Sequence, residues 1–178
     1  KGITLHILSG PKGRARQMNL GAEFARGDIL LFLHADTVLP HHFDKHIHSP
    51  LTSEALVLGS FHLQSDTDTY KMKWICWWAN IRTRVFSLPY GDQALFIRRH
   101  DFIHVGMFPE LEIMEDFVLV RQIKRQSGKI HILKDAVVTS ARRWHKRGFL
   151  FTTLCNQVMI LGYYLKIPTR YLAHWYRR

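Results

Sequence analysis

The positions of the apolar residues along the chain predict an alternating series of strands and helices. Residues 4–8 form a short β-like run that ends in the turn-forming cluster at 9–13. Small apolar residues then recur with helical spacing over 15–25, and the apolar run 29–33 has the length of a buried strand. This strand, helix and strand predict a βαβ unit in a parallel sheet covered by helices.

The rest of the sequence predicts a single domain, because no linker or repeat interrupts it. The expected fold is an α/β sheet, mixed and mostly parallel, flanked by helices. Residues 1–145 are expected to form its catalytic α/β part, and the aromatic, basic residues 146–178 a helical C-terminal extension. The further predicted elements are helices over 40–49, Tyr70–Phe86, 115–127 (ended by Gly128), 148–165 and 169–178, and strands over 55–63, 94–98, 130–133 and 137–139.

Charge favours an anionic partner such as nucleic acid, acidic lipid or a phosphorylated ligand. The formal net charge is +11, and residues 142–178 contain Lys and Arg but no Asp or Glu. Cys76 and Cys155 lie far apart in apolar runs, which is typical of small buried residues in a reducing compartment. With no signal peptide at the start of the chain, the expected location is cytoplasmic, extending to peripheral contact with the inner face of the membrane.

The first candidate site is the predicted helix start after residues 9–13. Arg14 and Arg16 supply guanidinium groups, and Gln17 and Asn19 supply amides, beside backbone N–H groups that no helical carbonyl accepts. Such a helix start favours phosphate. The alternative is a solvated basic first turn, although arginines there oppose the helix dipole and an anion would relieve that cost.

The second candidate site follows the predicted strand 29–33. Ligands of parallel α/β sheets bind beyond the carboxyl ends of the strands, and His34, Ala35 and Asp36 lie there. A hard carboxylate suits Mg²⁺ or Mn²⁺ bridging the oxygens of a diphosphate, and His34 would add a ligand or bond the donor. The alternative is that Asp36 caps a turn before Pro40.

The third candidate is the acid pair Glu115 and Asp116, which opens a predicted helix. A carboxylate at a helix N-terminus can accept the proton of an attacking hydroxyl as a general base. Acids in a first turn are also ordinary capping residues, so both interpretations stay open.

Two further segments are candidates for binding an acceptor. Gly91, Asp92 and Gln93 precede a predicted strand and would line a pocket, or they form only a tight turn. Arg143 and Trp144 combine a cation with a planar ring, which suits a diphosphate or a sugar ring. The alternative for this pair is a basic surface patch.

These sites, in this order and at these intervals, resemble the inverting nucleotide-sugar enzymes of glycosyltransferase family 2, which have the Rossmann-like GT-A fold. Residues 13–22 resemble the family's helix bearing Arg and Asn, residues 27–37 its strand and DxD loop, and Glu115-Asp116 its acid pair. The motifs at 13–19, 33–37, 91–94 and 140–144 look closest to a bacterial subgroup linked to arsenosugar biosynthesis and radical-SAM gene neighbourhoods.

The resemblance implies a transfer of hexose with inversion from a nucleotide sugar, most simply a UDP-sugar, to a small-molecule or lipid-linked acceptor. Asp116 would be the general base, and Asp36 would hold Mg²⁺ or Mn²⁺ with His34 beside it. Arg14, Arg16 and Asn19 would contact the nucleotide side of the donor.

The departures from the family pattern carry expectations of their own. His34 stands where the DxD loop has its first acid, so Asp36 is its only carboxylate. Ser140 stands where processive members have Gln, which predicts no synthesis of a long polymer. The family's first strands do not precede residue 4, so this chain is expected to be a fragment that lacks its N-terminal strands, binds sugar nucleotides poorly and is inactive by itself.

The competing interpretation is a basic module that binds nucleic acid or a membrane surface without catalysis. Trp74, Trp77 and Trp78 recur at helical spacing and are expected in the core, which argues against a stacking platform and against a nucleic-acid partner. Residues 148–178 are apolar with flanking cations and suit an interfacial helix, or they pack as a helix pair on the sheet. The oligomeric state stays open.

Overall fold

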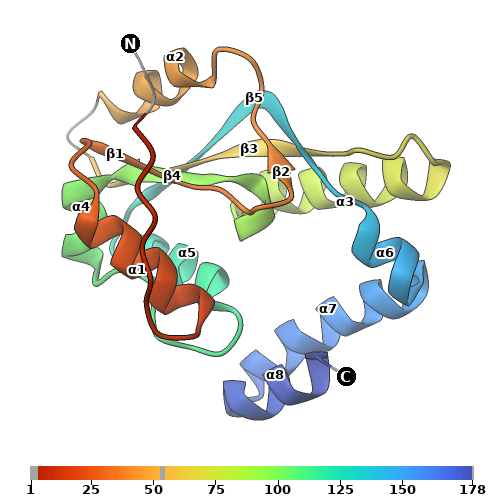
Figure 1. Cartoon of the computed structure of the whole chain (residues 1–178). Coiled ribbons are helices and arrows are strands. Elements are labelled where there is room, and N and C mark those ends of the chain that lie inside the picture. The colour runs from red at the N-terminus through yellow and green to blue at the C-terminus, as the bar shows by residue number, and fades with distance from the viewer. Residues whose placement is uncertain (1–3, 53–54, 178) are drawn as a thin grey trace.

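The computed structural model describes residues 4–52 and 55–177. Within them, five strands form one sheet in the order β1-β4-β3-β5-β2 (Figure 1). β3 and β5 pair in parallel along the longest ladder, whereas β1–β4, β3–β4 and β2–β5 are antiparallel. The mixed α/β sheet expected from the sequence is confirmed. Its strands are β1 (Ile29–Phe32), β2 (Thr37–Val38), β3 (Val57–Ser65), β4 (Leu95–Arg98) and β5 (Lys129–Thr139).

Helices cover both faces of the sheet, because side chains of a strand alternate between its two faces. On one face α1 (Arg14–Phe24), α4 (Arg99–Val105) and α5 (Glu115–Arg125) share a buried apolar cluster with β1, β3 and β4. On the other face α2 (Phe43–His48), the short 3₁₀ turn η1 (Ser49–Leu51) and α3 (Tyr70–Phe86) share a second cluster with the sheet. In Figure 1, α1, α4 and α5 lie below the sheet and α2 lies above it.

The C-terminal helices α6 (Arg142–Arg147), α7 (Phe149–Tyr164) and α8 (Thr169–Arg177) form a group of their own below the sheet (Figure 1). The apolar cluster that attaches α7 and α8 joins them to α5, through Met114, Phe117, Met159 and Leu172. This pair of helices therefore packs on helix α5, and the expected packing of the pair on the sheet is wrong.

The predicted βαβ unit at the start of the chain is wrong. Residues 4–8 are exposed and form no strand, with Leu5 81% and Ile7 89% exposed. A strand needs a partner to take its backbone hydrogen bonds, and the partner of β1 among the described residues is β4, which runs antiparallel to it. The strands predicted at 130–133 and 137–139 are one strand, β5, because a register shift opposite Ser60 and His62 accommodates the polar residues between them.

Helix α3 has the predicted bounds, but its tryptophans do not enter the core as predicted. The side chains that do are Met72, Cys76 and Ala79, and burial raises the pKa of the Cys76 thiol to about 11. Trp74, Trp77 and Trp78 are 46%, 55% and 50% exposed. The spacing of residues identifies the faces of a helix but does not show which of two apolar faces meets the sheet. Here the face with the smaller side chains, Cys76 and Ala79, meets the sheet.

Helix α5 ends at Arg125, two residues before the predicted end, and the left-handed residue beyond it is not the predicted Gly128. Ser127 takes that conformation, with φ 59°, while the Gly128 amide donates to the carbonyl of Ile123 at 2.9 Å. Gly128 therefore closes the helix through its backbone, in close contact with the Ile123 side chain.

Gly59 of β3 packs so closely against Phe96 of β4 that adding a methyl group, as in Gly59→Ala, is expected to destabilise the sheet. A Cβ there would lie 1.9 Å from Cζ of Phe96, which is fully buried and cannot swing away. We expect Gly59→Ala to lower the free energy of unfolding by about 1–3 kcal/mol or more through overpacking. Urea unfolding followed by circular dichroism measures this.

The matched control is Gly21→Ala, because a Cβ at this helical position meets nothing within 4 Å. It is expected to raise the same free energy by about 0.5–1 kcal/mol. Equal stability of the Gly59→Ala variant and the wild-type protein would contradict the packing described.

Candidate active site

The loop after β1 is held by hydrogen bonds of its backbone. The Thr37 amide donates to the His34 carbonyl at 3.1 Å, which turns the chain back into β2. The Ser140 amide donates to the Asp36 carbonyl at 3.1 Å and ties the loop to the end of β5. Ala35 and Asp36 are exposed and His34 is half-buried. The loop is thus a fixed turn that presents a carboxylate to solvent at the carboxyl end of β1.

Gly91 lies where three of the predicted segments meet. Its amide donates to Oδ2 of Asp116 at 2.7 Å. A Cβ at Gly91 would lie 2.9 Å from Nε2 of His34 and 3.0 Å from the same Asp116 oxygen. The 3₁₀ turn η2 (Gly91–Gln93) therefore packs against both the loop after β1 and the first turn of α5, and a side chain at Gly91 would require the His34 ring or the Asp116 carboxylate to shift.

The acid pair at the start of α5 divides into two roles. Glu115 is 1% exposed and its Oε1 accepts a hydrogen bond from Nε of Arg14, at the start of α1. Asp116 is half-buried, and besides Gly91 it accepts a hydrogen bond from the Phe117 amide through Oδ1, at 2.7 Å. Since a carboxylate has about four lone-pair sites, Asp116 keeps capacity for a further proton donor.

Burial disfavours the charged form of Arg14, but the hydrogen bond that Arg14 donates to Glu115 and the nearby negative charges outweigh it. Coulombic attraction to Asp116 and Glu115 is among these effects, and the net result raises the pKa of Arg14 above its ordinary value. The guanidinium is thus permanently charged, and it is already engaged by a protein carboxylate.

Asp92 carries the clearest electrostatic perturbation of the site. Burial raises the pKa of its carboxyl group, and the charge of Asp116 raises it further, against the opposing effects of Arg82, His34 and Arg14. Its Oδ1 is buried without a hydrogen-bond partner in the described part of the chain. A buried carboxylate in this position costs free energy that a bound hydroxyl or cation would offset.

Two residues near Asp92 were not predicted from the sequence. Arg82 of α3 stacks over the ring of Tyr90, with Cζ 3.6 Å from the ring centroid. Tyr176 of α8 carries a pKa raised by burial, and Arg143, Arg14 and Asp92 all contribute to its electrostatic environment. No sequence signal distinguishes them, because Arg82 lies in a basic helix and Tyr176 in the aromatic C-terminal stretch.

Other predicted site residues are engaged in structural contacts. Asn19 exchanges two hydrogen bonds with the backbone of Phe108, at 2.8 and 3.1 Å, and is 8% exposed. Gln93 is fully buried and bonds Thr83 and the carbonyl of Phe61. These two amides connect elements of the fold, and the structure does not present them to a ligand.

The remaining predicted residues lie on the surface around the site. Gln17 is exposed, and Nε of Arg16 donates to Glu110 at 2.9 Å. The Arg143 guanidinium lies over the ring of Tyr176, with Cζ 4.1 Å from the centroid. Trp144 contacts Phe149 of α7, with ring centroids 6.0 Å apart. Arg143 is thus linked to the site through Tyr176, whereas Trp144 belongs to the packing of α7.

A divalent cation would find a limited set of protein ligands here. Over residues 4–52 and 55–177, no three His, Cys, Asp or Glu side chains group as metal ligands. The exposed Asp36 carboxylate suits Mg²⁺ or Mn²⁺, which are commonly bound by one or two carboxylates, with water and phosphate oxygens as the other ligands. The residues present therefore fit a cation that arrives with a diphosphate.

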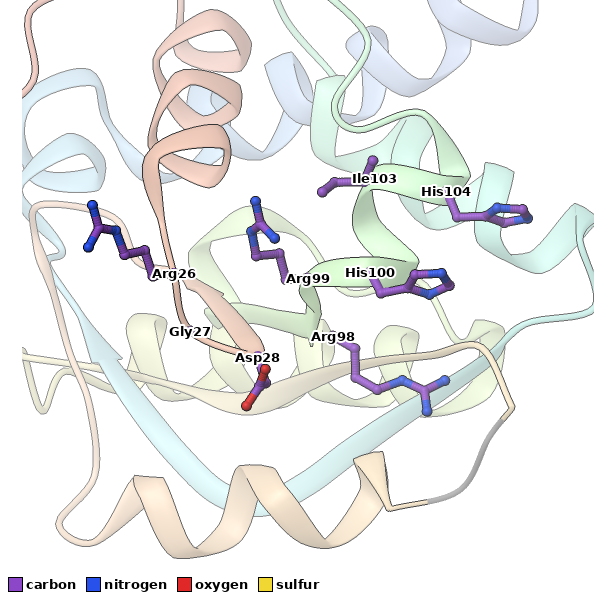
Figure 2. Close-up of a pocket in the computed structure, with 8 residues that line it drawn as sticks. All are labelled: Arg26, Gly27, Asp28, Arg98, Arg99, His100, Ile103 and His104. Carbon is purple, nitrogen blue, oxygen red and sulfur yellow. The ribbon is translucent and has the colours of Figure 1, made fainter.

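A hollow of about 510 Å³ lies at the opposite end of the β1–β4 pair, around Asp28 and Arg98. The four residues of β1 separate it from the His34 loop by about 13 Å. Figure 2 shows Arg26, Arg98 and Arg99 turned in three different directions, and Arg98 is bonded to Asp101. These cations do not converge on one ligand, so the candidate site is the group around Gly91.

A mixed α/β sheet with an acidic loop at a strand end, a glycine turn and an acid-headed helix is the arrangement that the resemblance to glycosyltransferase family 2 predicts. The model of glycosyl transferase family 2 matches residues 1–108, more than half of the chain, and the chain therefore belongs to this family. The protein is accordingly a glycosyltransferase. The matched range includes Arg14, the His34–Asp36 loop and Gly91, and it ends before Glu115. No match is found among curated proteins.

The raised pKa of Asp92 predicts a stability that falls as the pH rises. Above its ordinary pKa of about 3.9, the unfolded chain releases the proton that the folded state still holds, so ionisation opposes folding. We expect Asp92→Asn to be more stable than the wild-type protein at neutral pH, by a difference that grows from pH 4 upward and levels off above the folded pKa. Urea unfolding across this pH range measures it.

Asp44→Asn is the control, because Asp44 is an exposed acid on α2, and its effect should not grow with pH in this way. If Asp92→Asn instead becomes less stable than the wild-type protein as the pH rises, the attraction of the Asp92 carboxylate to Arg82 and Arg14 outweighs the effect of burial.

Proposed function

We propose that the protein transfers a hexose from a nucleoside-diphosphate sugar, most simply a UDP-sugar, to one acceptor hydroxyl with inversion. The observation that carries the proposal is the meeting of three segments at Gly91. The loop suited to the donor phosphates and the acid suited to act as base lie on either side of this one residue. Ser140, in place of the Gln of processive enzymes, supports a single transfer.

In this proposal Asp116 is the general base and the reaction is one displacement. The acceptor oxygen attacks the anomeric carbon and passes its proton to Asp116 as the new C–O bond forms. The bond from that carbon to the diphosphate oxygen breaks on the opposite face, and its electron pair leaves with the nucleoside diphosphate. The Gly91 amide holds the Asp116 carboxylate in place, and Asp92 lies where it would line the acceptor pocket.

Asp36, with His34 beside it, would hold Mg²⁺ or Mn²⁺ in the proposed enzyme. A bound cation there stabilises the negative charge that gathers on the departing diphosphate. Arg14, Arg16 and Gln17, at the start of α1, are proposed to contact the phosphates of the donor, with Arg14 held toward them by Glu115.

We further propose that residues 1–145 form the catalytic part and residues 146–178 an extension that contacts a membrane peripherally on its cytoplasmic side. The motifs around Arg14, Asp36, Gly91 and Arg143 support a place in the bacterial subgroup linked to arsenosugar biosynthesis. The acceptor is then a small molecule or a lipid-linked one.

The experiment that tests the function is a panel of nucleotide sugars and acceptors with Mn²⁺, scored for release of the nucleoside diphosphate. Asp116→Asn keeps an oxygen to accept from the Gly91 amide but cannot take a proton at neutral pH. We expect it to lower kcat by about 10²–10⁴-fold with little change in KM for the donor. The control Asp44→Asn should keep wild-type rates, and wild-type turnover in Asp116→Asn would remove this base assignment.

Asp36→Ala tests the cation site separately. Without the exposed carboxylate, the Mn²⁺ concentration for half-maximal activity should rise at least about tenfold. Even the loss of a residue that only supports a metal ligand typically lowers metal affinity by about this factor. The measurement is a Mn²⁺ titration at saturating donor, with Asp44→Ala as control. An unchanged titration would show that donor phosphates bind without help from Asp36.

A further inference from the structure

The outer face of α7 is mostly apolar, and none of the residues that the structure describes covers it. Met159, Cys155 and Gly162 face inward, against α5 and α8, and are buried. The opposite face forms a stripe at helical spacing in which polar Gln157 is an exception. Its members are 42–73% exposed: Leu150, Phe151, Leu154, Val158, Leu161 and Leu165.

The exposed tryptophans of α3 extend this stripe. Trp74 and Trp78 stack with ring centroids 6.3 Å apart, and Trp77 lies 6.2 Å from Trp78. Trp74 also contacts Phe149, the first residue of α7, at 6.3 Å between centroids. The stripe of α7 and these three tryptophans therefore form a continuous surface, named here the aromatic face. Contiguous exposed apolar surface of this kind marks an interaction site.

Cations border the aromatic face at both ends of α7. Arg142 and Lys146 precede the helix, and Lys166 and Arg170 follow it, all of them exposed. The 16 residues of α7 span about 24 Å, so these two pairs lie at opposite edges of the face. No Asp or Glu occurs after Asp135 in the sequence.

The acids closest to this surface are already engaged. Asp66, before α3, accepts a hydrogen bond from the Ala141 amide at 2.8 Å. Asp68 pairs with Lys73 at 2.8 Å, and Glu112 accepts from the Thr169 hydroxyl at 2.7 Å. With Asp68 neutralised by Lys73, the four bordering cations outnumber the two remaining acids, Asp66 and Glu112, so the border of the aromatic face carries a net positive charge.

We propose that the aromatic face docks on an anionic phospholipid bilayer, with α7 lying flat in the interface. Tryptophan side chains favour the headgroup level, leucines enter the acyl boundary, and each bordering Lys or Arg is attracted to the phosphates of an anionic surface. No helix in the described part of the chain is long and apolar enough to cross a bilayer, so the contact is peripheral. This inference rests on the peripheral membrane contact proposed above, for which it names the surface and the class of lipid, and it does not depend on the transfer reaction.

The charge pattern selects a bilayer over a second copy of the chain. Two copies meeting through this face would bring the same cationic borders together, and like charges at an interface repel. In an anionic bilayer the leucines would instead contact acyl chains, and the bordering cations would contact lipid phosphates.

The test is sedimentation of the protein with vesicles of equal parts phosphatidylglycerol and phosphatidylcholine, compared with phosphatidylcholine alone. We expect the protein to bind the anionic vesicles, and this binding to weaken at high salt. The reason is that the Debye length, over which charges attract, falls to about 3 Å at 1 M salt. Leu154→Gln with Leu161→Gln should weaken this binding at least about tenfold, since both side chains lie exposed on the stripe. Tryptophan emission should be quenched by brominated acyl chains, less so in Trp77→Gln.

The control is Ile103→Gln on α4, which changes an exposed apolar side chain outside the aromatic face, 46% exposed. It should bind vesicles as the wild-type protein does. Failure of the wild-type protein to bind anionic vesicles, or unchanged binding by the Leu154/Leu161 variant, would overturn the proposal. So would a lipid-free dimer that this variant abolishes, since the face would then pair with a second copy.

Discussion

The ion pair between Arg14 and Glu115 is the interaction on which the arrangement of the candidate site depends. Glu115 is 1% exposed, and a buried carboxylate without a partner costs several kcal/mol. The pair joins the first turn of α1 to the first turn of α5, and so sets the place of Asp116, the next residue. Asp116 in turn receives the Gly91 amide, and Gly91 packs against His34. Four segments are thus ordered by one buried charge.

This dependence changes the meaning of the basic start of α1. Arginines at a helix N-terminus oppose the helix dipole, and in this chain a carboxylate of the protein relieves part of that cost. Arg14 is therefore both a structural partner of Glu115 and a fixed positive charge beside Asp92 and Asp116. Its position is set before any donor binds, which is the preorganisation that electrostatic stabilisation of a leaving group requires.

The sequence predicted the elements with strong periodicity and missed what depends on long-range pairing. Helix α3 has the predicted bounds, because its seventeen residues combine helical spacing with a Thr69 cap. The strand predicted at residues 4–8 is wrong, because an apolar run has the same pattern whether or not a neighbouring strand is there to pair with it. The predicted burial of the three tryptophans of α3 is wrong for a related reason, since periodicity does not show which face a helix buries.

For the candidate site, residue types and spacing identified the three segments that meet at Gly91, but not the partner of each side chain. Asn19 and Gln93 have the chemistry of ligand-binding amides, yet their partners are groups of the fold: the backbone of Phe108 for Asn19, and the Thr83 hydroxyl and the Phe61 carbonyl for Gln93. Arg82 and Tyr176 reach the site from helices far along the chain, so no local pattern marks them. Whether a polar residue serves the fold or a ligand is decided by its tertiary neighbours, which the spacing of residues does not contain.

The absence of a side chain at Gly91 also has a mechanical consequence. The His34 ring and the Asp116 carboxylate both lie so close to Gly91 that a Cβ there would be 2.9 Å from one and 3.0 Å from the other. Gly91 also donates its amide to Asp116, so the backbone that faces the loop after β1 is the same backbone that holds the acid. The two sides of the site are thus linked through one residue.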